Sequence, residues 1–186
     1  LINPALKMSE PVRLICKEGD QNSLLSELAI NKLDLVLTDQ PLQAGNHVKA
    51  YSHHLTESGL TFFAAKSLAD KCGDNFPQSL SGKPFLLPGK STAVRQRLAA
   101  WFEKHDLHPN IDAEFDDTEL MKSFGQEGYG VFTSPTIIED TITSQCQVEI
   151  IGRTTEIKEH YYVITPDRRL KHPAVVEIVD AVSKGF

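Results

Sequence analysis

The spacing of apolar residues along the chain switches repeatedly between the alternation typical of a strand and the spacing typical of a helix. This pattern predicts strands and helices in alternation. Residues 12–18 alternate as a strand would, which places Cys16 in a core. Leucines at helical spacing predict a helix over residues 21–31, with Asp20 as its N-cap, and residues 33–38 form a second short apolar strand. This strand–helix–strand order indicates an α/β fold with mostly parallel sheets.

The remainder of the chain continues the same alternation. Residues 47–56 and 60–66 predict extended segments that break at Ser58 and Gly59, and residues 67–84 predict a largely loop region. Further strands are expected at 85–87, 111–115, 131–133, 147–151 and 160–165, and further helices at 92–106, at 118–127, from Pro135 and from Pro173.

Two lobes are expected from the distribution of these segments. The middle block has strands and helices of its own, whereas the flanking blocks look incomplete without each other. We therefore expect a discontinuous lobe of residues 1–56 and 160–186 and a continuous lobe of residues 57–159, joined by two crossing strands.

Charge and cysteine content narrow the class of protein. The chain carries 19 Lys and Arg against 25 Asp and Glu, a net charge of −6. Its richest basic cluster is residues 167–171, so this part of the protein is not expected to hold DNA by phosphate neutralisation. No export signal and no membrane-spanning run are visible. Cys16, Cys72 and Cys146 are widely spaced, which favours free thiols in the cytoplasm.

Motifs that would indicate an enzyme are incomplete. Residues 88–92 resemble the end of a phosphate-binding loop, but Pro84 stands where its first glycine would fall, so a capped helix start is favoured. Neither zinc-ligand spacing nor a nucleophile–base pair is present. Adjacent acids at 116–117 and 139–140 are typical of helix caps. We therefore predict neither catalytic residues nor a cofactor.

Asp20 and Asp39 follow the ends of the first two predicted strands. In open α/β sheets, ligands bind outside the carboxyl ends of the strands, which brings Asp20, Thr38 and Asp39 near one another by topology. One interpretation is turn formation and helix capping. The other is hydrogen bonding to an effector, or oxygen ligation of a cation, for which the hydroxyls of Thr38, Ser91, Thr92 and Thr133 are suitable further ligands.

Several motifs in order along the whole chain resemble the effector domains of LysR-type transcription regulators. The first is Glu-Gly-Asp at 18–20, followed by a helix and Lys-Leu-Asp-Leu-Val-Leu-Thr-Asp at 32–39. Later motifs are Phe-Leu-Leu-Pro at 85–88, Trp-Phe-Glu-Lys-His at 101–105, Gly-Tyr-Gly-Val-Phe at 128–132, Tyr-Tyr at 161–162, Arg-Arg at 168–169 and His-Pro-Ala-Val at 172–175. The resemblance is closest to the branch that activates sodium/proton antiporter genes.

This resemblance implies two Rossmann-like lobes, as in type II periplasmic binding proteins, with a small effector or a sodium ion between them. The family's effector-binding positions map onto Asp20, Gln21, Thr38, Asp39, Ser91, Thr92 and Thr133, and Asp20 and Asp39 are the possible sodium ligands. The family also implies a homodimer or tetramer that pairs lobes through residues 4–18 and 92–116, and a response to sodium and alkaline stress.

Two features of the family are not found in this sequence. The helix-turn-helix that contacts promoter DNA and the first strand of the first lobe are both expected before Leu1, so we expect a fragment. Two alternatives remain open at this point. One is an exported solute-binding protein with the same scaffold, and the other is an enzyme that uses the helix start at residues 89–92.

Overall fold

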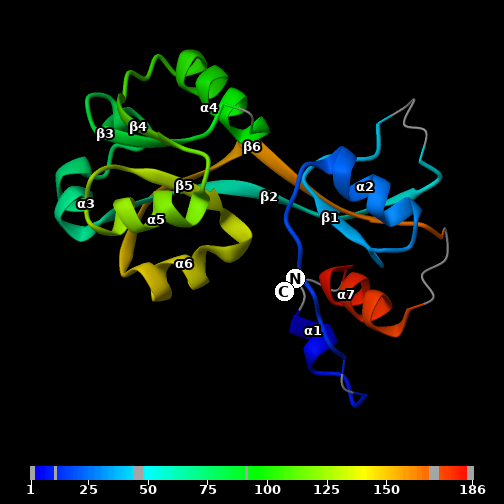
Figure 1. The fold of residues 1–186 in the computed structure, drawn as a ribbon. Helices are drawn as coiled ribbons and strands as arrows, with labels where there is room; N and C mark the ends of the chain where they lie inside the picture. The colour runs from blue at the N-terminus through cyan, green and yellow to red at the C-terminus, as the bar shows by residue number, and fades with distance from the viewer. Residues whose placement is uncertain (1–2, 11, 44–47, 91, 168–171, 184–186) are drawn as a thin grey trace. The chain divides into compact units, whose positions relative to one another are not determined.

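A computed structural model of the chain describes residues 3–10, 12–43, 48–90, 92–167 and 172–183. It divides into two compact units: unit 1 comprises Leu1–Glu57 and His160–Phe186, and unit 2 comprises Ser58–Glu159. Two long strands, β2 (Tyr51–Ala65) and β6 (Val148–Thr165), each contribute residues to both units (Figure 1). None of the helices among the described residues has the length and apolar character needed to cross a bilayer.

Unit 1 is built around the first strand of a four-stranded sheet with the order β1-β6-β2-β5. β1 (Val36–Thr38) pairs antiparallel with β6, with Val36 opposite Ile164. Val36 of this strand and Leu35, the residue before it, face different helices. Val36 packs with Leu25 of α2 (Gln21–Ala29), whereas Leu35 packs with Ile178 of α7 (Pro173–Ser183). The short helix α1 (Asn3–Leu6) packs against α7.

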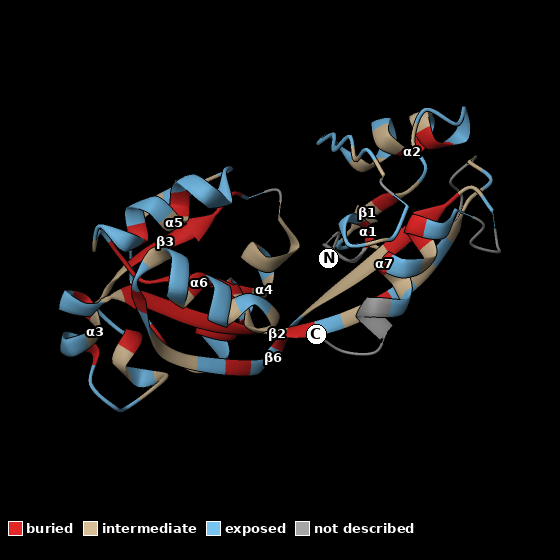
Figure 2. Cartoon of the chain, turned by 90° about the horizontal axis from the view of Figure 1, so that it is seen from below, coloured by how far each residue is buried: buried red, intermediate tan, exposed pale blue. Residues whose placement is uncertain are grey.

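In unit 2 the strand β2 is buried on both faces. β2 pairs antiparallel with β5 (Phe132–Pro135), and β3 (Pro84–Pro88) pairs parallel with β4 (Asn110–Phe115). Phe62 of β2 packs with Trp101 of α4 (Ala93–Lys104), while its neighbour Phe63 packs on the opposite face with Met121 of α5 (Thr118–Gln126). Figure 2 shows the buried residues along β2 and β3 and the exposed outer faces of α5 and α6 (Glu139–Cys146).

Local signals in the sequence account for the helix starts. Asp20 caps α2 by accepting a hydrogen bond from the Ser23 backbone N–H at 3.0 Å, and Asp117 caps α5 by accepting from Glu119 and Leu120 at 2.8 and 3.1 Å. Both caps confirm the prediction. The remaining elements are α3 (Lys66–Cys72) and two short 3₁₀ turns, Gln78–Leu80 and Thr136–Ile138.

Several expectations about strands and loops were wrong. Residues 12–18 form no strand, because no described residue offers them a strand partner, and Cys16 is exposed rather than in a core. The extended segments broken at Ser58 and Gly59 are one continuous strand, and so are the segments on either side of residues 152–159. A helix, α3, occupies part of the region expected to be loop.

The sheets are also not mostly parallel. Among the described residues, β1 with β6 and β2 with β5 pair antiparallel, whereas β3 with β4 and a bridge from Phe85 to Val131 are parallel. Both antiparallel pairs involve β2 or β6, the long strands that contribute residues to both units. A strand–helix–strand order in the sequence therefore did not determine the direction of every pair.

Candidate functional site

A pocket of about 430 Å³ lies in unit 1 where the start of α2 meets the end of β1. Three of the residues predicted for the effector site line it: Gln21 from the first turn of α2, and Thr38 and Asp39 from the end of β1. The remaining lining residues are Gly19, Leu24, Val36, Leu37 and Gln40. The sequence analysis expected the residues before the helix and those after the strand to lie near one another, and they do so although residues 12–18 form no strand.

Hydrogen bonds hold the polar side chains of this pocket in place. The Gln21 side-chain amide donates to the carbonyl oxygen of Gln40 at 3.3 Å, which ties the helix start to the loop after β1. The Thr38 hydroxyl accepts from the Gln40 backbone N–H at 3.2 Å, and this turn orients Thr38 and the exposed Asp39. The pocket thus combines hydroxyl, amide and carboxylate groups with the apolar side chains of Leu24 and Val36.

Asp20 lies next to this pocket but is fixed by its role as a cap. Hydrogen bonds from the side chain and the backbone of Ser23 lower the pKa of Asp20, so its carboxylate remains charged in mildly acidic solution. One of its oxygens is engaged by Ser23, and the side chain is exposed. The capping interpretation of Asp20 is therefore correct, and a ligand contact would have to use its second oxygen.

The predicted site residues of unit 2 lie on two different elements. Thr92 precedes α4, and its hydroxyl donates to the Gly89 carbonyl oxygen at 2.8 Å instead of capping the helix. Thr133 is buried in β5 opposite Phe62 of β2. Ser91 lies outside the described residues, as does most of the basic cluster at 167–171.

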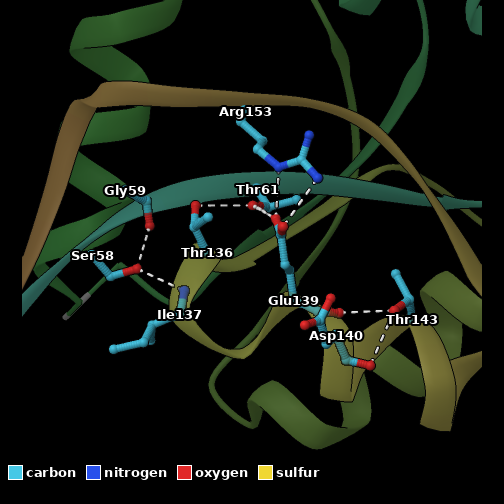
Figure 3. A network of polar contacts seen from close by, with 9 residues as sticks. All are labelled: Ser58, Gly59, Thr61, Thr136, Ile137, Glu139, Asp140, Thr143 and Arg153. Carbon is cyan, nitrogen blue, oxygen red and sulfur yellow. Dashed lines mark hydrogen bonds and ion pairs between the residues drawn. The ribbon is translucent and has the colours of Figure 1, made fainter. Parts of the chain in front are cut away.

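A polar network in unit 2 was missed by the sequence analysis. Arg153 donates two hydrogen bonds to the Glu139 carboxylate at 2.8 and 3.0 Å, and the buried Thr61 hydroxyl lies 2.8 Å from the same carboxylate and 2.9 Å from the Thr136 hydroxyl (Figure 3). The hydrogen bonds from Arg153 are the main cause that lowers the pKa of Glu139. Glu139 lies in the first turn of α6, as expected of a dipole partner, and its side chain also joins α6 to β2 and β6.

The composition of these sites limits the chemistry they offer. Among the described residues, no group of three or more His, Cys, Asp or Glu side chains is placed to hold a metal ion. Burial raises the pKa of the Cys72 thiol, which disfavours a reactive thiolate at that position. The pocket of unit 1 is instead suited to bind a small polar molecule or an ion through oxygen ligands.

Comparison with known proteins identifies the family. The family model of the LysR substrate binding domain matches residues 10–186. The transcriptional activator protein NhaR of Escherichia coli (strain K12) is 32% identical over 178 residues, and the match covers 96% of this chain. It covers 58% of the relative, so this chain spans little more than half the length of that protein.

Solved structures of regulators share the fold at low sequence identity. The regulatory domain of Synechocystis PCC6803 CcmR, in complex with 2-PG, superposes with a TM-score of 0.60 at 17% identity over 89% of this chain and 79% of that chain. Vibrio fischeri DarR, in complex with DNA, superposes with a TM-score of 0.69 at 16% identity over 98% of this chain and 61% of that chain. The chain therefore belongs to the LysR substrate binding domain family, a regulatory domain of transcription regulators rather than an enzyme.

Proposed function

We propose that this chain is the effector-sensing domain of a cytoplasmic transcriptional activator that responds to sodium or alkaline stress and controls a sodium/proton antiporter gene. The observation that carries the proposal is the 32% identity to the activator NhaR over 96% of the chain. Promoter DNA would be contacted by a helix-turn-helix elsewhere in the full-length protein, which we expect to act as a homodimer or tetramer. The two compact units are proposed to be the two regulatory lobes.

The pocket of unit 1 supports an effector role for the residues that line it. Gln21 and Thr38 offer an amide and a hydroxyl, and Asp39 offers an exposed carboxylate that makes no cap. Asp20 adds a second carboxylate beside them. For a sodium ion, Asp20 and Asp39 are the proposed ligands, because hard cations prefer carboxylate and other oxygen ligands. Ser91, Thr92 and Thr133 are proposed as effector contacts from unit 2.

Activation requires that the effector bind one state of the regulator more tightly than another. An effector shifts the equilibrium between two conformations only by its differential affinity for them, so it must alter contacts that differ between the states. We propose that effector binding favours one arrangement of the oligomer and thereby repositions the segments that contact DNA.

The test is the thermal stability of the chain in sodium chloride and in potassium chloride at equal ionic strength. A ligand at roughly 100 times its Kd stabilises the native state by about 2.7 kcal/mol. For a chain of this size that raises the Tm by roughly 5–10 °C. Asp39→Ala is expected to abolish the sodium-specific increase.

The matched control for that variant is Asp34→Ala. Asp34 is an exposed acid of the same unit that does not line the pocket, so its removal changes the net charge equally and leaves the sodium effect intact. Identical melting curves in the two salts would refute direct sodium sensing by this chain. The Tm of Asp39→Ala in potassium chloride, which should equal that of the parent chain, separates loss of sensing from loss of folding.

A further inference from the structure

Three ring side chains gather on β2 and β6 within unit 1, and we call them the histidine cluster: His54, His160 and Tyr162. The ring centroid of His54 lies 5.7 Å from that of His160 and 5.3 Å from that of Tyr162, and the two rings of β6 are 6.4 Å apart. His160 and Tyr162 alternate onto the same face of β6. None of the three residues belongs to the proposed effector site, so the cluster needs an explanation of its own.

The imidazole of His160 leaves one polar atom without a partner. Its Nδ1 atom is buried and makes no hydrogen bond to any described residue, although burying such an atom costs free energy. The Oε2 atom of Glu57 lies 3.8 Å from this nitrogen, beyond hydrogen-bond length but close enough for attraction between opposite charges. A proton on Nδ1 would give the carboxylate a charged donor. The geometry therefore fits a contact that forms fully only when His160 is charged.

Charged groups on three strands act on the ring of His160. β6 lies between β1 and β2 in the sheet, and Glu57 and His54 both come from β2. On β6, Lys158 stands two residues before His160 on the same face, and the exposed acid after the end of β1 is Asp39. The two acids favour a positive charge on His160, whereas Lys158 and a second proton on His54 oppose it. The cluster therefore takes up one proton more readily than two.

The histidine cluster reaches the candidate pocket through one pair of opposite residues. In the antiparallel pair of β1 and β6, Tyr162 is directly opposite Thr38, which lines the pocket. Side chains of directly opposite residues share a face, with their Cβ atoms about 5 Å apart. Tyr162 in turn contacts the rings of His54 and His160. A change in the charge or position of the His160 ring is thus only two side chains away from a proposed effector contact.

We propose that His160 and Glu57 form a proton-dependent contact between β6 and β2 that regulates the pocket of unit 1. In mildly acidic solution the imidazolium pairs with the Glu57 carboxylate and holds the two strands together. Histidine usually changes its charge between about pH 5 and 8, so at alkaline pH the proton passes to solvent and the pair is lost. The stabilisation is therefore present at low pH and is lost as the pH rises. Its use as an alkaline sensor rests on the proposed function, whereas the contact itself does not.

The first measurement is amide hydrogen exchange of residues 160–165 at about pH 6 and about pH 8.5, on either side of the range in which histidine changes charge. After correction for the intrinsic effect of pH, protection should fall about threefold at the higher pH, because a half-exposed ion pair contributes modestly. Glu57→Gln and His160→Gln should each remove this change, since either variant lacks one member of the pair. Equal protection at both pH values in the parent chain, or an unchanged loss in both variants, would overturn the proposal.

Two other histidines serve as controls. His108 is an exposed residue of unit 2 that lies 3.2 Å from Asp106, so His108→Gln removes a similar pair away from the cluster and should behave as the parent chain does. His53 is next to the cluster in sequence, but its ring is hydrogen-bonded to the Thr165 hydroxyl at 3.2 Å. If His53→Gln or His108→Gln, and not His160→Gln, removed the pH dependence, the proposal would be wrong.

The second measurement tests whether the contact regulates the pocket. The apparent Kd for sodium, taken from the Tm at increasing sodium and constant ionic strength, should fall about twofold at the higher pH, because a positive charge near the pocket is lost. His160→Gln should bind sodium at both pH values with the Kd that the parent chain has at alkaline pH. A pH-dependent Kd that persists in His160→Gln would overturn the regulation of the pocket. If sodium has no effect on the parent chain, the proposed sodium site fails, whereas the exchange result decides on the proton-dependent contact independently.

Discussion

The polar network of unit 2 provides a quantitative test of how this half of the chain is stabilised. Thr61 is fully buried, and its hydroxyl lies within hydrogen-bond distance of the Glu139 carboxylate and the Thr136 hydroxyl. Thr61→Val removes the hydroxyl with little change of volume. A hydrogen bond to a charged group contributes about 1.5–3 kcal/mol, and Glu139 keeps its pair with Arg153, so we expect a loss of about 2 kcal/mol.

The assay is urea unfolding followed by fluorescence of the single tryptophan. Trp101 lies buried in the core of unit 2 and therefore reports on the unit that contains the network. Thr155→Val is the control, because Thr155 is an exposed residue of β6 with the same change of side chain. A midpoint that is unchanged in Thr61→Val, or lowered equally in Thr155→Val, would refute the assignment of this energy to the network.

Three further predictions concern the same unit. The pKa of Glu139 is lowered in the folded state, so its contribution to stability is present above the ordinary pKa of 4.5 and is lost as the pH falls through the folded value. The difference in unfolding free energy between Glu139→Gln and the parent chain should therefore shrink below that pH, which acid unfolding experiments measure. Asp117→Ala should cost about 1 kcal/mol in urea unfolding and Asp117→Asn far less, since asparagine also caps helices; equal losses would contradict the capping role. Gly125→Ala should lower the Tm although alanine favours helices, because the added Cβ would lie 2.1 Å from the buried Phe132 ring. The expected net cost in stability is about 1–2 kcal/mol. A higher Tm would show that the Phe132 ring moves freely and would contradict this prediction.

Features that depend on neighbouring residues in the sequence were predictable. The caps at Asp20 and Asp117 follow from short polar side chains before apolar periodic segments, and the structure confirms both. The meeting of Gln21, Thr38 and Asp39 around one pocket was expected because a helix start and the end of the following strand lie close together. Such features need no information on what lies across the sheet.

Features that depend on distant partners were not predictable. Thr61 and Glu139 are 78 positions apart, and no local pattern marks either residue as a member of a network. Gly59 was expected to interrupt a strand, yet in the structure it lies within β2 and allows the backbone of β2 to approach that of β6. A Cβ at Gly59 would lie 2.7 Å from the Thr154 carbonyl oxygen. Residues 12–18 have the alternation of a strand, but a strand forms only when a partner supplies hydrogen bonds.

The order of the two units along the chain has a consequence for folding. Unit 2 is one continuous stretch, whereas unit 1 is completed only by residues from His160 onward. During synthesis all of unit 2 leaves the ribosome before β1 can pair with the far end of β6, and contacts of such long sequence separation form slowly. We therefore expect refolding in two phases, in which the fluorescence of Trp101 recovers before α7 docks, so that the half containing the candidate pocket matures last.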